Sequence, residues 1–254
     1  MYPSIQIGPV LLPTACIVLW AGLMALVATA ASRSRHYGLD RGVVVGALLA
    51  GIAGFAACGW LFHDSLRRQA NGGGTPGDAI AAVAVVVFWA AFRRIRLSQL
   101  ADCLAPALAL FLFIARVGCF MAGCDYGRPT GHSWGVRYTN GLALAWYGTP
   151  LGIPLHPIQL YESALAAALL AFLILLRNKP WREGMLFCLF AAVYSLGCFL
   201  IEFLRGDAEH GFLGPLSEQQ WLCVLVLAAV LSSRARGCNP SGGGITRVEV
   251  SSHR

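Results

Sequence analysis

Charge is what this sequence has least of. Of its 254 residues, 12% are Asp, Glu, Lys or Arg, whereas 57% are hydrophobic. A soluble domain carries about twice that share of charged residues, because its surface must face water. The shortage of charge excludes an ordinary soluble globular protein. The mean hydropathy of +0.64 indicates a chain that crosses a membrane several times.

Other absences exclude particular classes of membrane protein. The alternation of polar and apolar residues that marks barrel strands is missing, so α-helices are expected to span the bilayer. A transporter is expected to show internal repeats and paired polar residues near midspan. The sequence shows neither, which disfavours a transporter. The single lysine, Lys179, falls in a loop, which disfavours a retinal protein. The nine cysteines lie mostly inside apolar runs and do not form a disulfide framework.

Seven apolar runs are candidates for membrane-spanning helices, because a bilayer core needs about 20 apolar residues per helix. The third and seventh runs are short, so their ends are the least certain. The runs are residues 7–31, 42–62, 78–92, 100–120, 157–176, 184–204 and 219–232.

The basic residues give these runs an orientation. The net charge of +7 does not indicate a nucleic-acid partner, because arginines occupy the short loops between apolar runs. Thirteen Lys and Arg residues fall on one side and six on the other, which accounts for all 19. Since basic loops stay in the cytoplasm, the N-terminus is expected outside and the C-terminus inside. We predict an all-α, seven-helix membrane domain over 1–232, an extracytoplasmic loop region over 121–156, and a disordered tail over 233–254.

The polar, glycine-punctuated segment R-V-G-C-F-M-A-G-C-D-Y-G-R-P-T begins at Arg116, directly after an apolar run. A guanidinium at membrane depth is costly unless it has a partner. It is suited to a phosphate, whose oxygens match its fork. The alternatives are that Arg116 snorkels to the membrane interface, or that it forms an ion pair with Glu162 or Glu202.

The segment L-H-P-I-Q-L-Y-E opens the fifth apolar run. His156 precedes a proline at the first helical position, and Gln159, Tyr161 and Glu162 fall in the first turns. Tyr161 is either a site residue or an interfacial anchor. The Glu162 carboxylate lies just inside the span, where a charged partner is expected.

Two further groups of polar residues stand at the outer ends of spans. Glu202 and Arg205 are three apart on one helix face, where a local ion pair is the simplest expectation. Cys119 and Cys124 have the spacing of neither a C-x-x-C redox motif nor a common zinc site, so we expect no metal and no cofactor. For these two cysteines, packing or a structural bridge ranks ahead of catalysis.

Taken together, these segments resemble the prolipoprotein diacylglyceryl transferase family. The resemblance covers Ile7-Gly8-Pro9-Val10, A-D-C-L-A-P, R-V-G-C-F-M-A-G-C-D-Y-G-R, H-P-I-Q-L-Y-E, I-E-F-L-R-G-D, and residues 217–219 before the last run. Each motif is modest alone, and their order and separation make the match specific. Seven spans with the N-terminus outside are also what that family has.

The resemblance implies a transferase at the outer leaflet of a bacterial inner membrane. Its members transfer diacylglyceryl from phosphatidylglycerol to the thiol of a lipobox cysteine in a prolipoprotein, forming a thioether. Phosphatidylglycerol, the lipobox of a prolipoprotein signal peptide and membrane lipid are therefore the expected partners. By position, Arg116 would hold the lipid phosphate and Arg205 would stabilise the leaving phosphate. The alternative is a paralogue that binds anionic phospholipid with another acceptor or without transfer.

The sequence departs from the family at several polar positions. The family signature reads G-N-F-x-N-G-E, whereas Cys119, Ala122 and Cys124 stand where it has two asparagines and a glutamate. The family's outward loop carries a histidine that the corresponding residues 73–77 lack, and a tyrosine expected in the first span is missing. The departures leave open which group accepts the thiol proton.

His156, His210 and Asp125 are the alternatives for that base, and we predict His156. The predicted catalytic residues are Arg116, Arg205 and His156. The predicted substrate-binding residues are Arg116, Cys119, Cys124, Gly127, Gln159, Tyr161 and Glu202.

Overall fold

Helices make up most of the fold. The computed structural model describes residues 4–7, 10–66, 76–176, 181–206 and 212–237. Most of the expected tail, from residue 238 onward, and His210 lie outside the described residues. The long helices are α1 (Thr14–Arg33), α2 (Arg41–Leu66), α3 (Pro76–Phe92), α4 (Leu97–Ala122), α6 (Ile158–Leu176), α7 (Met185–Ile201) and α8 (Glu218–Gly237).

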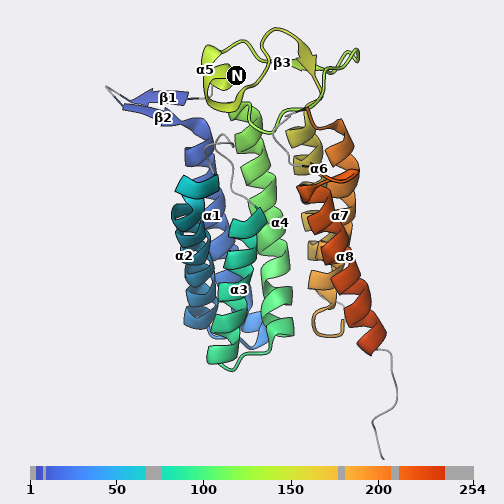
Figure 1. The fold of residues 1–254 in the computed structure, drawn as a ribbon. Helices are drawn as coiled ribbons and strands as arrows, with labels where there is room; N and C mark the ends of the chain where they lie inside the picture. Colours follow the sequence, from blue (N-terminus) through green and yellow to red (C-terminus); the bar gives the residue numbers. More distant parts are fainter. Residues whose placement is uncertain (1–3, 8–9, 67–75, 177–180, 207–211, 238–254) are drawn as a thin grey trace, which may run out of the picture.

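Helix α4 is the centre of the bundle. It packs against α1 on one side and against α6 and α7 on the other, while α2 pairs with α3 and α7 pairs with α8. Figure 1 shows the α1–α3 group and the α6–α8 group on opposite sides of α4. Leu100, Leu104 and Ala107 of α4 are buried against Leu26 and Ala30 of α1. Any residue near the end of α4 is therefore close to both groups.

The helices present apolar side chains outward, as lipid-facing helices do. Large exposed hydrophobic residues surround the bundle, among them Trp20, Met24, Trp60, Phe88, Leu175 and Leu225. A soluble protein rarely exposes so much apolar surface. Five helical segments are long and apolar enough to cross a membrane, and 77–92 and 218–233 are shorter apolar helices. The chain is thus a multi-pass membrane protein, and each of the seven predicted runs contains a helix.

The first predicted run begins too early. We expected a helix from residue 7, but α1 starts at Thr14, after Pro13 in an extended conformation. The residues before it form an antiparallel hairpin of β1 (Ser4–Ile7) and β2 (Val10–Pro13). Proline has no N–H to donate into a helix, and it suits the position at which a helix begins.

The residues between α4 and α6 fold over one end of the bundle, and we call this segment, residues 123–157, the loop cap. It contains α5 (Gly141–Tyr147) and a two-stranded antiparallel sheet of β3 (Val136–Arg137) and β4 (Pro154–Leu155). A second hairpin, which is the third small sheet, joins β5 (Phe212–Leu213) to β6 (Leu216–Ser217). The fold is mostly helical, which is consistent with the predicted all-α membrane protein, and the three small sheets lie at the ends of the helices. Figure 1 places α5 and β3 at the same end as β1 and β2.

Candidate functional site

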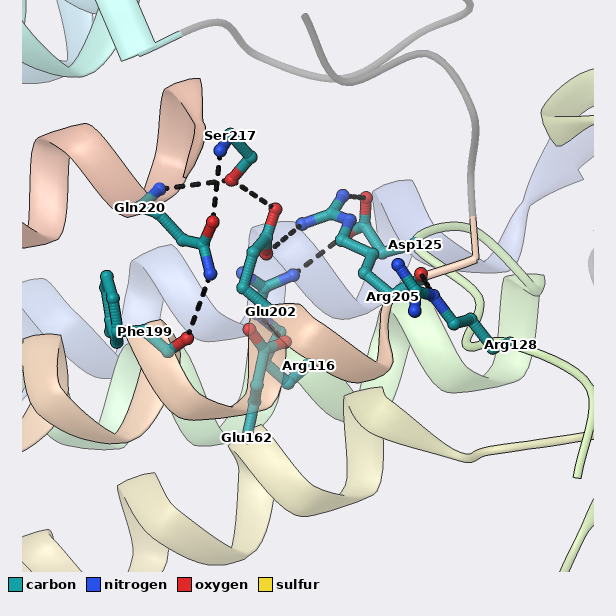
Figure 2. Close-up of polar contacts among 9 residues, drawn as sticks. All are labelled: Arg116, Asp125, Arg128, Glu162, Phe199, Glu202, Arg205, Ser217 and Gln220. Atoms are coloured by element: carbon teal, nitrogen blue, oxygen red, sulfur yellow. Dashed lines mark hydrogen bonds and ion pairs between the residues drawn. The ribbon is translucent and has the colours of Figure 1, made fainter. Parts of the chain in front are cut away.

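Two arginines from distant parts of the chain meet at the loop-cap end of the bundle. Arg116 lies near the end of α4, and Arg205 directly follows the short 3-10 helix η2 (Glu202–Leu204). Asp125 bridges them: its Oδ2 lies 2.9 Å from Nη1 of Arg116, and its Oδ1 lies 2.6 Å from Nη2 of Arg205. Both guanidinium groups are thus held by one carboxylate (Figure 2).

Each arginine also has a carboxylate of its own. Nε of Arg116 lies 2.9 Å from Oε2 of Glu162, and Nη1 of Arg205 lies 3.5 Å from Oε2 of Glu202. These contacts confirm the ion-pair alternatives that the sequence raised for both arginines. The Glu162 and Glu202 side chains are 7% and 6% exposed, whereas Asp125 is 27% exposed. Asp125 is therefore the carboxylate of this cluster that an incoming molecule can reach most easily.

The described cluster contains more carboxylates than guanidinium groups, and we call these five side chains the arginine network. They are Arg116, Asp125, Glu162, Glu202 and Arg205. Buried charges of opposite sign stabilise each other only when their geometry and hydrogen bonds are good. The Nη2 group of Arg116 has no partner among the residues that the structure describes. Its N–H donors are therefore suited to an acceptor supplied by a ligand.

The backbone at the end of α4 explains how Asp125 reaches the arginines. Gly123 ends the helix in the left-handed region, with a φ of 92°, and its N–H donates to the carbonyl of Cys119 at 2.8 Å. Asp125 also has a positive φ, 53°. Aspartate tolerates this region better than most residues, because its short polar side chain can form local hydrogen bonds. The resulting turn directs the chain back over the helix end toward Arg205.

Backbone hydrogen bonds hold the two segments side by side. The N–H of Gly206 donates to the carbonyl of Tyr126 at 3.0 Å, and the N–H of Arg128 donates to the carbonyl of Leu204 at 2.8 Å. Gly127 and Arg205 form the antiparallel bridge between these bonds. A Cβ on Gly127 would collide with the backbone carbonyl of His156. Gly127, predicted to bind substrate, thus permits a close backbone approach beside the arginine network.

Side chains from the start of α8 fix Glu202. The hydroxyl of Ser217 donates to Oε1 of Glu202 at 2.9 Å. Ser217 and Gln220 also bond reciprocally, side chain to backbone, at 3.1 Å and 3.0 Å. Nε2 of Gln220 donates to the carbonyl of Phe199 at 3.5 Å, as Figure 2 shows. Helix α8 therefore supports the carboxylate that holds Arg205.

Gln159 ties α6 to the turn that carries Asp125. Its Nε2 donates to the carbonyl of Cys124 at 2.6 Å and lies 3.4 Å from the hydroxyl of Tyr138. The Tyr138 hydroxyl donates to the carbonyl of Phe120 at 3.2 Å. Burial raises the pKa of Tyr138, so this phenol stays protonated and keeps its donor. Gln159, also predicted to bind substrate, thus holds the carbonyl of the residue that directly precedes Asp125 of the arginine network.

His156 of the loop cap and Tyr161 of α6 belong to a separate aromatic group. Nδ1 of His156 lies 3.4 Å from the Tyr161 hydroxyl, which accepts a bond from Nε1 of Trp134 at 3.0 Å. The ring of His132 stacks on that of Trp134 and lies edge-on to His156. In the described contacts, the imidazole of His156 faces these rings, and its backbone carbonyl lies against Gly127. The structure thus joins His156 to the arginine network through backbone, and its role as the base stays a prediction.

Cys119 and Cys124 lie next to Asp125 and carry free thiols. The two sulfur atoms and a carboxylate oxygen of Asp125 all lie within 4.8 Å of one another. Hydrogen bonding to Cys119, together with burial, raises the pKa of Cys124 well above its ordinary value. Both oxygens of Asp125 already face arginines, so this group is poorly suited to hold a cation.

An apolar cavity of about 1290 Å³ lies between the helices on either side of α4. Its walls come from six helices and include Leu23, Phe55, Val86, Leu104, Phe187 and Val230. Phe111 of α4 also lines it, and Arg116 follows five residues later, about 7.5 Å along the helix axis. The cavity thus begins within two helical turns of the arginine network.

Sequence reasoning found both arginines and their outer carboxylates but missed the bridge between them. It named Asp125 only as an alternative base. A signal was present: a carboxylate two residues after a glycine, just beyond a helix that carries an arginine six residues before its end. Sequence alone did not show that Arg205, 80 positions later, shares that carboxylate.

Comparison with known proteins gives a consistent result. The sequence matches the family profile described as prolipoprotein diacylglyceryl transferase over residues 5–233. The phosphatidylglycerol–prolipoprotein diacylglyceryl transferase of Geobacter sulfurreducens is 34% identical over 215 residues, which cover 79% of this chain and 78% of that protein.

Two further proteins of the same name are similar over most of their length. The protein of Clostridium tetani is 29% identical over 218 residues, 81% of this chain and 85% of its own. That of Pseudomonas putida strain F1 is 29% identical over 258 residues, 91% of this chain and 94% of its own.

Proposed function

The chain belongs to the prolipoprotein diacylglyceryl transferase family, and from this premise we propose that it transfers diacylglyceryl from phosphatidylglycerol to a prolipoprotein cysteine. The observation that carries the proposal is the arginine network, in which one half-buried carboxylate holds two guanidinium groups. Such a pair suits a phosphodiester in which one ester bond breaks and negative charge grows on the departing phosphate.

The proposed reaction is a displacement at carbon. The lipobox sulfur attacks the diacylglyceryl carbon that carries the phosphate ester, a C–S bond forms, and the C–O bond to phosphate breaks. Glycerol phosphate leaves with the electron pair, and the thiol proton passes to a base. We propose that Arg116 binds the phosphate through its Nη2 group, while Arg205 stabilises the charge on the leaving group.

Asp125 is the base that the geometry favours. It is the most exposed carboxylate of the arginine network, and the network has one carboxylate more than it has arginines. As Arg205 turns to the leaving phosphate, Asp125 loses one of its two guanidinium contacts and becomes able to accept a proton. His156 is the second candidate, because it lies on the loop cap beside Gly127.

The remaining predicted residues surround this centre. Glu202 holds Arg205, and Gln159 holds the turn before Asp125. We propose that Cys119, Cys124, Gly127 and Tyr161 shape the walls within which the phosphate and the thiol meet. The lipid's acyl chains extend into the apolar cavity that begins below Arg116.

We also propose the orientation. Seven spans place the N-terminus and the loop cap outside the cytoplasm, with the membrane domain over 1–232 and the residues after it in the cytoplasm. The arginine network then lies toward the outer leaflet of the bacterial inner membrane. Lipobox segments that emerge on that side can reach it.

The first experiment uses the purified protein in vesicles that contain phosphatidylglycerol, with a lipobox peptide as acceptor. Release of glycerol phosphate and formation of the lipidated peptide are both measured. Arg116→Lys keeps the charge but loses the planar fork, so we expect the rate to fall about 100-fold or more. Arg137→Ala is the matched control, because Arg137 is an exposed arginine of the loop cap outside the network.

Three results decide the proposal. Transfer that requires the peptide and is lost in Arg116→Lys but not in Arg137→Ala supports it. Full transfer by Arg116→Lys removes Arg116 from phosphate binding. If the wild type binds phosphatidylglycerol and releases no product with the peptide, the lipid-binding paralogue is the better reading.

A further inference from the structure

The proposed transfer does not use the thiol chemistry of Cys119 and Cys124, although both thiols lie beside Asp125. Cys119 lies in the last turn of α4, and Cys124 is the second residue beyond the helix. Both are half-buried, so small reagents can reach them. Cys124 Sγ lies 3.7 Å from the carbonyl oxygen of Cys119.

The way in which α4 ends brings these two side chains together. Gly123 adopts the left-handed conformation and bonds back to Cys119. The left-handed residue turns the chain back over the last turn of the helix. The Cys124 side chain, which follows it, consequently lies against Cys119, with its Sγ 3.7 Å from that residue's carbonyl oxygen. The contact is therefore built into the backbone and does not depend on a flexible loop.

The charges around the pair favour a covalent bridge over a metal ion. Asp125 is the only third ligand near the sulfur atoms in the described part of the chain, and its oxygens are 2.9 Å and 2.6 Å from two arginines. A cation would have to compete with those guanidinium groups. A disulfide adds no charge, and the sulfur atoms, which lie within 4.8 Å of each other, need to approach to about 2.05 Å to form it.

We propose that Cys119 and Cys124 are a reversible oxidation site that closes into an intramolecular disulfide. The oxidant is an external disulfide, from a small molecule or an oxidoreductase. Two thiols of the protein and one external disulfide give one protein disulfide and two external thiols, so both protons and both electrons pass to the oxidant. An extracytoplasmic loop cap would place the pair where such oxidants persist.

The bridge would act on the residue that follows it. The carbonyl of Cys124 accepts the Gln159 bond, and Asp125 comes next with its positive φ. A disulfide fixes the turn from Cys119 to Cys124. It therefore holds Asp125 between the two arginines more firmly than the dithiol form does.

The test uses the full-length wild-type protein, equilibrated with either oxidised or reduced glutathione and then alkylated with N-ethylmaleimide. Trypsin releases residues 117–137 as one peptide, because the bond after Arg128 precedes a proline. After reduction we expect a doubly alkylated peptide. After oxidation we expect an unalkylated peptide lighter by two hydrogens than the dithiol. Dithiothreitol should restore alkylation.

Two variants sharpen the result. In Cys119→Ser, Cys124 cannot close the bridge and should be alkylated or glutathionylated in both buffers. Cys188→Ser, a half-buried cysteine of α7, should leave the two-hydrogen loss intact. In thermal unfolding, oxidised wild type should melt a few degrees above its reduced form, and Cys119→Ser should show no such difference.

Double alkylation in the oxidising buffer, or separate glutathione adducts on both cysteines, would overturn the proposal. The mass measurement does not depend on catalysis. A protein that closes the bridge and transfers no lipid would refute the proposed function and leave this inference standing.

Discussion

Asp125 supplies the charge that lets two arginines lie next to each other. In Asp125→Asn the side chain keeps its size and its tolerance of a positive φ, but the shared negative charge is lost. We expect lipid transfer to fall about 10²- to 10⁴-fold, the usual contribution of a general base. The rate is measured with the vesicle assay, and membrane insertion is checked by the yield of folded protein.

Asp40→Asn is the matched control, because Asp40 accepts a bond at the start of α2, away from the arginine network. It should keep the wild-type rate. If Asp125→Asn is as active as wild type while His156→Ala is inactive, the thiol proton goes to His156 instead.

At position 127 only glycine fits, because the neighbouring atoms leave no room for a side chain. A Cβ there would strike the His156 carbonyl and lie 3.0 Å from Ile158. Gly127→Ala should therefore lower the free energy of unfolding by about 1–3 kcal/mol, the usual cost of overpacking. Thermal unfolding in detergent measures the change.

Gly131→Ala provides the comparison within the same loop cap, since a Cβ there meets nothing within 4 Å. Gly131→Ala should have the same free energy of unfolding as the wild type. Equal stability of the two alanine variants would show that the backbone at Gly127 moves aside without cost.

At the scale of elements, the start of α8 joins helix capping to the site. Ser217 and Gln220 form a capping box, and the Ser217 hydroxyl also holds Glu202. Ser217→Ala should cost about 0.5–2 kcal/mol of stability, as the loss of a cap does. It should also reduce transfer, because Glu202 would hold Arg205 less firmly.

Stability and transfer are measured on one preparation, with Ser32→Ala as control. The hydroxyl of Ser32 is exposed and, among the described residues, donates to the carbonyl of Thr29 in its own helix. A Ser217→Ala variant with unchanged stability and unchanged transfer would remove α8 from the support of the site.

The helices could be predicted from the sequence because each of the seven runs is mostly apolar, and the third and seventh, which are the shortest, correspond to the two shorter apolar helices. The small sheets could not. Residues 7–13 are as apolar as the helix that follows them, so composition does not separate the hairpin from α1. The pairing of Val136 with Leu155 depends on a chain reversal through α5, and two-residue strands leave no periodicity to detect.

For the whole molecule, the bias of the basic residues predicts which end of the bundle faces outward. Ser133 is exposed on the loop cap, and Arg94 is exposed between α3 and α4 at the opposite end. In intact cells, a membrane-impermeant maleimide should label Ser133→Cys above the background of the native cysteines. Arg94→Cys should need permeabilised cells. The reverse pattern would invert the proposed orientation.

The charged residues of the site were predictable because burying each of them in a bilayer is costly. Arg116, Glu162, Glu202 and Arg205 all stand at the ends of apolar runs, where a partner was expected. Their pairing across the bundle was not predictable, because it depends on how α4, α6 and α7 pack. The contact of Asp125 with both arginines was the hardest to predict, because it depends on a backbone turn that the sequence pattern does not indicate.

The assembly of the arginine network has a consequence for biogenesis. During synthesis, Arg116 and Asp125 leave the ribosome together, Glu162 follows with α6, and Arg205 follows only after α7. Until α7 is inserted, Asp125 and Glu162 share a single guanidinium near the membrane surface. Nascent chains that stop before Arg205 therefore lack the second guanidinium that Asp125 contacts in the finished protein, and the loop cap stays unattached to the α6–α8 group at this point until α7 is inserted.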